Sequence, residues 1–139
     1  MEYKRFNNVI VARLNKGEEV LEQIKEISLK ENIKLANVNA LGATNDFTVG
    51  VYNIDEKKYY SNSFTGNFEI VSLTGSINTM DGNFYTHIHM SCGDSEGKVF
   101  GGHLNRAVIS ATCEMFIYII DGTVDRFHDD ETGLNLFKF

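Results

Sequence analysis

Only one segment of this chain has the periodicity of a helix, and nearly everything after it is patterned as β-structure. Within residues 15–32, apolar residues recur on one helical face, at Val20, Leu21, Ile24 and Ile27. Glu18 and Glu19 fall in the first turn and Lys30 in the last, which suits the helix dipole. A single helix must bury its apolar face against another element, so the predicted strands decide the fold.

Short apolar or alternating runs separated by turn signals predict these strands. The predicted strand segments are 3–14, 33–43 (ending at Gly42), 46–54, a strand that follows the turn at 55–60, 66–80, 81–92 (opening with an Asp81-Gly82 turn), 97–104, 107–120 and 123–139. One helix and about eight strands predict an α+β fold with a mostly antiparallel sheet.

Composition sets further bounds. At 139 residues, 42% of them hydrophobic, the chain suits one domain with an ordinary core, so we expect residues 1–139 to form a single domain. Cys92 and Cys113 are too few for a disulfide scaffold, and the charged start MEYKRF is unlike a secretory signal. The longest apolar run, residues 115–120, is far shorter than the roughly 20 residues of a membrane span. These features predict a cytoplasmic protein with reduced thiols.

The charge balance bears on nucleic-acid binding. The net charge is −6, from 13 Lys and Arg against 19 Asp and Glu. Nucleic-acid binding takes most of its affinity from cations that neutralise phosphates. The cationic clusters YKR and EKKYY are too small to follow a duplex, so the chain is a poor match to a nucleic-acid-binding protein.

Three of the four histidines lie close together, in the segment THIHMSCGDSEGKVFGGHL (86–104). Side chains two residues apart in a strand project from the same face, so His87 and His89 point the same way. The position of His103 depends on the turn between them. Residues 94–97, DSEG, fit a type I turn followed by a left-handed glycine, which predicts a three-residue loop.

A loop of Ser95, Glu96 and Gly97 fixes the register of this hairpin. His103 then lies opposite His89, and Asn105 lies opposite His87. A loop shorter or longer by one residue would send His103 to the other face, so the turn sequence itself favours three imidazoles on one face.

Three histidines with an open fourth position form the arrangement of a catalytic-type zinc site. We therefore predict a divalent metal site at His87, His89 and His103, with zinc as first choice and iron, nickel or manganese compatible with the ligand type. Gly101 and Gly102 are expected to leave space beside His103 for water or a small ligand. The alternative is ordinary, because a histidine in a strand is most often a hydrogen-bonded or half-exposed structural residue.

Glu114 interrupts an apolar run and is a further candidate, because a carboxylate in a buried strand needs a partner. It either joins the site, as a ligand, a histidine-orienting group or an acid or base, or forms an ion pair with Arg106 or Arg126. Arg106 is the second candidate for assisting catalysis. Cys92 is expected in the core, facing away from the histidines, and His128 in a polar surface turn.

The segment SLTGSINTMDGNFYTHIHMSCGDSEGKVFGGHL and the following ISATCEMFIYII resemble the PPC (plants and prokaryotes conserved) domain. In bacteria this domain is often described as a DNA-binding protein with a PD1-like motif. The resemblance covers nearly the whole chain, from LNKGEEVLEQI and NVNALGAT to DRFHDDETGLNLF. The motifs H-x-H, G-K-V-x-G-G-H-L and T-C-E are its most specific parts.

The resemblance implies a strongly curved, mostly antiparallel sheet with one long helix packed on it, and assembly as a homotrimer. In land plants the domain accompanies AT-hooks, which read the minor groove, and mediates assembly with itself and with partner proteins. This chain contains no AT-hook, so weak or no intrinsic DNA affinity is expected. The fold is also similar to that of acetolactate decarboxylase, in which three histidines hold a catalytic zinc, and this similarity carries onto His87, His89 and His103.

Two classes of function follow. One is a stand-alone homotrimeric assembly or regulatory module, in which the histidines stabilise the domain or sense a metal. The other is a small metal-dependent lyase or hydrolase, in which the ion polarises water and Glu114 or Arg106 assists. The two classes share the metal site and differ in whether a substrate is turned over.

Overall fold

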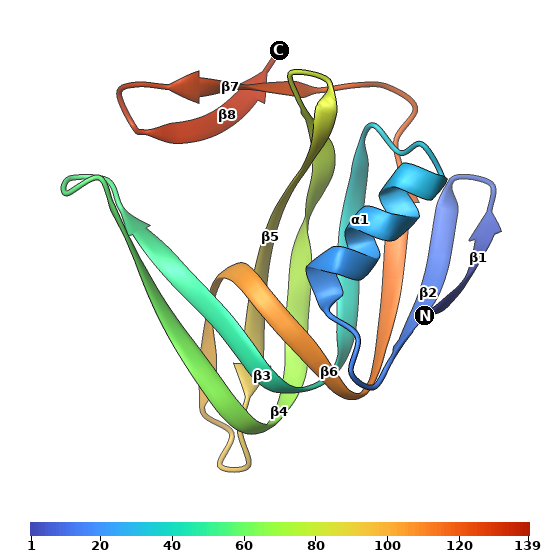
Figure 1. Cartoon of the computed structure of the whole chain (residues 1–139), viewed down its shortest axis with the longest axis vertical. Helices are drawn as coiled ribbons and strands as arrows, with labels where there is room; N and C mark the ends of the chain where they lie inside the picture. Colours follow the sequence, from blue (N-terminus) through green and yellow to red (C-terminus); the bar gives the residue numbers. More distant parts are fainter.

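Eight strands and one helix make up the structure, a computed structural model that describes residues 1–139 (Figure 1). In chain order they are β1 (Glu2–Phe6), β2 (Val9–Asn15), α1 (Val20–Lys30), β3 (Ala36–Asn53), β4 (Lys58–Met80), β5 (Asn83–Gly93), β6 (Val99–Ile119), β7 (Asp125–Asp129) and β8 (Leu134–Lys138). All strand pairs are antiparallel, and the single helix packs on the sheet. The predicted α+β class is therefore confirmed.

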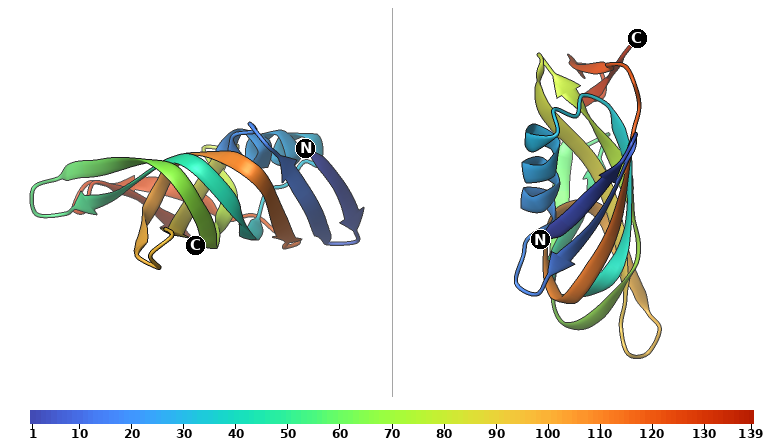
Figure 2. Two further views of the ribbon diagram at one scale, coloured as in Figure 1. Left: turned by 90° about the horizontal axis from the view of Figure 1, so that it is seen from below. Right: turned by 90° about the vertical axis from the view of Figure 1, so that its right-hand side faces the viewer.

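The main sheet has six strands in the order β1-β2-β6-β3-β4-β5, and β7 pairs only with β8. Strand β6 pairs with β2 and β3 in the middle of this sheet and also with β5 at its edge. Residues 113–118 of β6 pair with both β2 and β3, while residues 99–103 pair with β5. This additional pairing curls the sheet on itself, and Figures 1 and 2 show how strongly β3, β4 and β6 bend. The curvature brings the start of β6 against β5, where the predicted histidine hairpin lies.

Helix α1 covers one face of the sheet. Its residues Val20, Ile24 and Ile27 are fully buried, as their helical spacing predicts. They belong to one cluster of 23 buried residues that also includes Ile10, Leu14, Met115 and Ile117 of the sheet. The helix begins later than the predicted segment, because the carboxylate of Glu19 caps it by accepting the N–H of Glu22 at 2.8 Å. No helix of this structure is long and apolar enough to cross a bilayer.

Residues 3–14, predicted as one strand, form the hairpin of β1 and β2. The chain reverses at Asn7 and Asn8, and Asn7 adopts a φ of 52°. Asparagine tolerates this left-handed conformation better than most residues, so the asparagine pair makes the turn. The prediction of a single strand is wrong because the pair is a turn signal inside an otherwise strand-like run.

The predicted strands at 33–43 and 46–54 are one strand, β3, so the predicted end at Gly42 is wrong. The register between β3 and β4 shifts twice, next to Gly42 and next to Thr44. Each β-bulge interrupts the alternation of side chains, so a bulged strand looks in the sequence like two strands. Neighbouring predicted segments merge into β4 and β6 in the same way.

The other face of the sheet has no layer packed on it over β2, β6 and β3, and Figure 2 (right) shows α1 on one side only. Alternation along β6 places Phe116 and Tyr118 on this face, 40% and 44% exposed. Leu41 of β3, 57% exposed, lies on the same face, opposite Glu114 of β6. Large apolar side chains thus remain exposed on a face that the helix does not cover.

Candidate metal centre

The loop that joins β5 to β6 has the predicted geometry. The N–H of Asp94 donates to the carbonyl of Lys98 at 2.9 Å, and the N–H of Gly97 donates to the carbonyl of Asp94 at 3.1 Å. Gly97 has a φ of 79°, the left-handed region that glycine adopts without strain. The carboxylate of Asp94 accepts the N–H groups of Glu96 and Lys98, both at 2.9 Å. The loop therefore has the predicted three residues, Ser95 to Gly97, and holds the register.

This register places His89 opposite His103, as predicted. The ladder between β5 and β6 ends at this pair, because β6 then continues along β3. The predicted cross-strand pair of His87 and Asn105 therefore does not form, and His87 lies opposite Ser76 of β4 instead. His87 and His89 still share a face of β5.

The three imidazoles converge on one point of this face. Each offers a ring nitrogen, and the three nitrogens lie within 4.8 Å of one another. The Nε2 atoms of His87 and His89 are 3.2 Å apart. The ring of His103 lies 5.2 Å from that of His87 and 5.7 Å from that of His89, measured between centroids. His87 and His89 are exposed and His103 is half-buried, so the cluster opens to solvent.

Desolvation and mutual repulsion favour the neutral imidazoles of His87 and His103. Desolvation lowers the pKa of His87 below 6.5, and positive charge on His103, His89 and Arg126 lowers this pKa further. Desolvation also lowers the pKa of His103, with charge on His89 as the second cause. Neutral imidazole is the form that binds a metal, so the cluster is prepared for one at neutral pH.

The donor set fits a divalent transition-metal ion. Two Zn–N bonds of about 2.0–2.1 Å at a tetrahedral angle place their nitrogens about 3.3 Å apart. The Nε2 atoms of His87 and His89 are 3.2 Å apart, close to this requirement, while the three nitrogens together spread over up to 4.8 Å, so the rings would draw closer around a bound ion. The group contains histidines only and no carboxylate or thiol, a set that suits zinc, copper, iron and nickel better than magnesium or calcium.

Gly101 and Gly102 do not leave space for a ligand, contrary to the prediction. A Cβ on Gly101 would lie 2.8 Å from the carbonyl oxygen of Met90, and a Cβ on Gly102 would lie 2.5 Å from that of Gly50. Neighbouring strands already occupy this volume. The two glycines instead allow β6 to pass close to both β5 and β3, and this close approach positions His103.

Glu114 is not a member of the histidine cluster. It is exposed on β6, opposite Arg13 of β2, because β6 turns this residue to the uncovered face of the sheet. The premise that Glu114 is buried is therefore wrong. Neither predicted ion pair forms, since Arg106 pairs with Asp46 and Arg126 has no carboxylate partner.

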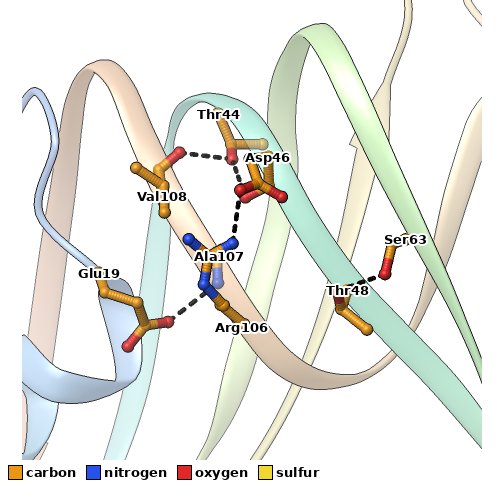
Figure 3. A network of polar contacts seen from close by, with 8 residues as sticks. All are labelled: Glu19, Thr44, Asp46, Thr48, Ser63, Arg106, Ala107 and Val108. Atoms are coloured by element: carbon orange, nitrogen blue, oxygen red, sulfur yellow. Dashed lines mark hydrogen bonds and ion pairs between the residues drawn. The ribbon is translucent and has the colours of Figure 1, made fainter.

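Arg106 belongs to a polar network between β3, β6 and the start of α1 (Figure 3). Its Nη1 donates to Oδ2 of Asp46 at 2.6 Å, and the carboxylate of Glu19 accepts the N–H of Ala107 at 2.9 Å. These contacts tie the helix to the bent part of the sheet. None of them reaches the histidines.

Cys92 is fully buried in the core, on the face of β5 opposite the histidines, as predicted. His128 is exposed, also as predicted, but it lies in strand β7 and not in a turn. Its Nδ1 lies 3.1 Å from Oδ1 of Asn135, in the hairpin of β7 and β8.

Two side chains beside the cluster could not be found from the sequence. Tyr59 of β4 meets the ring of His103 edge-on, with 6.1 Å between centroids. Arg126 of β7 lies 3.4 Å, measured from Nη2, from Oγ of Ser76, the residue opposite His87. The sequence suggests Arg126 only as an ion-pair partner, because β7 comes far after the histidine hairpin.

Solved structures with the same fold include one that contains metal. A candidate DNA-binding protein from Bacteroides thetaiotaomicron is similar with a TM-score of 0.96 and 26% identity, over 99% of this chain and 96% of that one. A metal-containing protein from Archaeoglobus fulgidus has a TM-score of 0.89 and 31% identity, over 99% and 97% of the two chains. A plant- and prokaryote-conserved (PPC) protein from Pyrococcus horikoshii has a TM-score of 0.86 and 29% identity, over 99% and 94%.

Sequence comparison agrees with the resemblance that the motifs imply. No curated protein matches the chain. The profile of the Plants and Prokaryotes Conserved (PCC) domain, the domain abbreviated PPC above, matches residues 1–121. This range holds α1, β1 to β6 and all three clustered histidines, while the hairpin of β7 and β8 lies beyond it. The chain therefore belongs to the Plants and Prokaryotes Conserved domain family.

Proposed function

We propose that this protein is a homotrimeric regulatory or assembly module of the PPC family. In this proposal it holds a divalent metal ion at His87, His89 and His103, with zinc as the first candidate. The observation that carries the metal site is the convergence of three ring nitrogens within 4.8 Å on the hairpin of β5 and β6. The metal-containing protein from Archaeoglobus fulgidus, 31% identical to this chain, supports the same conclusion.

The three imidazoles would hold the ion from one side and leave a coordination position toward solvent. A bound ion supplies a Lewis acid at this open position. The chain itself contributes position, because the Ser95–Gly97 loop and the close approach of β6 to its neighbours set the histidines before any ion arrives.

The trimer is supported by the uncovered face of the sheet. Phe116 and Tyr118 stack on each other there, and Leu41 lies on the same face opposite Glu114, all three between 40% and 57% exposed. Large clustered apolar side chains on one face mark an interaction surface more often than a solvated one. The family resemblance implies that a further copy of the same chain covers this face.

Direct DNA binding is not part of the proposal. The candidate DNA-binding protein from Bacteroides thetaiotaomicron carries that description, but this chain has a net charge of −6. Affinity for a duplex comes mainly from neutralised phosphates, and an acidic chain without a basic stripe has little to supply it. Any role at DNA would therefore pass through partner proteins.

Metal analysis of protein purified without an affinity tag tests the proposal. We expect about one divalent ion per chain, because three ligands on one face define one site. Zinc is expected to dominate when the purified protein is stripped and offered zinc, iron, nickel and manganese together. Protein that is metal-free after purification and fails to take up any of these ions would overturn the metal site.

A further inference from the structure

We propose that the histidine centre takes a small oxyanion, a carboxylate or a phosphate, and that Arg126 is the cationic partner of this ligand. The inference rests on the proposed metal site and adds the chemical class of its ligand. Four observations carry it: a buried charge without a partner, spare donors at one end of the guanidinium, a fixed position beside the cluster, and the charge balance of the centre.

Arg126 carries a buried positive charge that no acidic side chain neutralises. The residue is 6% exposed, and no Asp or Glu oxygen lies within 4.0 Å of it. Its guanidinium is sandwiched between two rings, with Cζ 4.8 Å from the centroid of Tyr85 and 4.3 Å from that of Phe137. Stacking on aromatic rings offsets part of the free energy that desolvation of the guanidinium costs, but it does not neutralise the positive charge. A counter-charge from outside the chain would compensate it.

The spare hydrogen-bonding capacity of Arg126 lies at the end nearest the histidines. Nε donates to Oδ1 of Asn78 at 3.0 Å and Nη1 donates to the carbonyl of Asn135 at 2.6 Å. Nη2 makes only a long contact of 3.4 Å with Oγ of Ser76. Ser76 lies opposite His87, and His87 is exposed. The least engaged end of the guanidinium is therefore the end beside the open cluster.

The hairpin of β7 and β8 is held in place above this part of the sheet. At its tip, Nζ of Lys57 from the β3–β4 hairpin donates to the carbonyl of Asp130 at 2.8 Å. Figure 1 shows both hairpins extending to the same side of the molecule. At its other strand, Nδ2 of Asn135 donates to the hydroxyl of Tyr85 at 3.3 Å. Arg126 is thus fixed next to the centre and does not swing in from solvent.

The charges of the centre select the ligand. The cluster contains three neutral ligands and no carboxylate, so a bound divalent ion keeps its full charge. Arg126 adds a further positive charge on the same face. A neutral or cationic ligand gains nothing from this field, whereas an oxyanion gains from both charges. With an ion held by the three histidines, one oxygen of the anion would bind the ion, and another would accept from Nη2 of Arg126 and from the hydroxyl of Ser76.

Cobalt(II) in place of zinc makes the centre visible, because the absorption of cobalt responds to its ligands. We would titrate cobalt-loaded protein with acetate, with inorganic phosphate and with acetamide, the neutral counterpart of acetate, at constant ionic strength. Acetate or phosphate should change the spectrum and acetamide should not. The stronger of the two anions identifies the ligand as a carboxylate or a phosphate.

The variant Arg126→Gln tests the assigned partner. Loss of a charge-assisted hydrogen bond should weaken anion binding about tenfold or more. Cobalt affinity, measured separately by competition with a chelator, should stay the same or rise, because a neighbouring positive charge is removed. Arg126→Lys keeps the positive charge but loses the planar guanidinium. Its anion affinity should lie between those of the wild-type protein and Arg126→Gln. Arg5→Gln on β1, which removes the same charge from an ion pair with Glu31 at the end of α1, is the control and should change neither affinity.

Each outcome separates the two claims. Protein that binds no cobalt overturns the proposed metal site, and this inference falls with it. Protein that binds cobalt but responds equally to acetate and acetamide keeps the metal site and overturns the oxyanion. A simultaneous loss of cobalt and anion affinity in Arg126→Gln, repeated in Arg126→Lys, would show that Arg126 only holds the hairpin in place and would also overturn the assignment.

Discussion

At the scale of single residues, the candidate centre depends on three imidazoles whose ring nitrogens lie within 4.8 Å of one another. The Nε2 atoms of His87 and His89 are 3.2 Å apart, a contact that two protonated rings could not share. The same separation suits two ligands of one ion. Residues that could have supplied a negative charge, Glu114 above all, face elsewhere. We therefore expect metal affinity and pH response to depend on the histidines themselves.

Replacing His89 by Ala should remove most of the metal affinity. Changes to groups that merely orient a metal ligand cost roughly 10–100-fold, so loss of a ligand should cost at least about 100-fold. Equilibrium dialysis of untagged protein against zinc measures this. The matched control is His128→Ala, since His128 is exposed on β7 and bonded only within its own hairpin. A His89→Ala protein with wild-type zinc affinity would contradict the assignment.

The metal-free protein should lose stability as the pH falls below 6.5. The pKa values of His87 and His103 are lowered from 6.5 in the folded state, so below pH 6.5 the unfolded chain binds more protons than the folded chain. The free energy of unfolding therefore decreases between pH 6.5 and the lowered values. Bound metal should steepen the dependence, because protons then compete for the ligands. Thermal unfolding between about pH 7.5 and 5.5 measures both effects, and a flat profile in metal-free protein would contradict the first.

At the scale of elements, the position of the cluster is set by a loop and by close strand packing. The Ser95–Gly97 loop places His103 opposite His89, and β6 then leaves β5 to pair with β3. This departure is possible because Gly102 allows the backbone of Gly50 to approach. A small change at the crossing point should therefore affect both the stability of the sheet and the centre.

Gly102→Ala should destabilise the protein and weaken zinc binding together. Its Cβ would lie 2.5 Å from the carbonyl oxygen of Gly50, so β6 must move away from β3 and carry His103 with it. Overpacking of this kind costs about 1–3 kcal/mol. Urea unfolding and zinc titration measure the two effects. Gly93→Ala is the control, because its Cβ would meet only Val71, at 3.6 Å, and both quantities should stay near the wild-type values.

At the scale of the whole molecule, the chain has a helix for only one face of its sheet. Leu41, Phe116 and Tyr118 are exposed on the other face, which the helix does not cover. The surface charge points the same way, since a net charge of −6 suits contacts between proteins better than contacts with phosphates. We therefore expect assembly to use the uncovered face.

The protein should be a trimer at micromolar concentration, and Phe116→Lys should dissociate it. A lysine at the centre of the uncovered face would bury an unpaired charge in the interface, while in the monomer it points to water. Light scattering coupled to size exclusion measures the mass, and circular dichroism checks that the variant stays folded. Leu29→Lys is the control, because Leu29 is 61% exposed on the helix side. A wild-type protein with the mass of a monomer would contradict the trimer.

Sequence-specific binding to duplex DNA should be absent. Any residual affinity should be no tighter than the nonspecific range of about 10⁻⁴–10⁻⁶ M at physiological salt, because the acidic chain neutralises few phosphates. Fluorescence anisotropy with AT-rich and GC-rich duplexes of equal length measures it. Tight binding that prefers one sequence would show that a surface of this chain reads DNA.

The sequence by itself determined the parts of this protein that local chemistry controls. DSEG specifies a three-residue loop through the side chain of Asp94 and the positive φ of Gly97, so the facing of His89 and His103 could be predicted without a structure. The spacing of apolar residues in α1 likewise specified its buried face. Such features involve residues a few positions apart, and their geometry follows from backbone preferences alone.

Only the tertiary structure decided what lies around the cluster. The bulges that fuse two predicted strands into β3, the close approach at Gly102 and the position of Arg126 near Ser76 all join residues far apart in the chain. The exposure of Glu114 depends in the same way on which face the helix covers. Long-range contacts are selected by the packing of the whole core, because a bulge or a curled sheet is stabilised by its neighbours and leaves little trace in local periodicity.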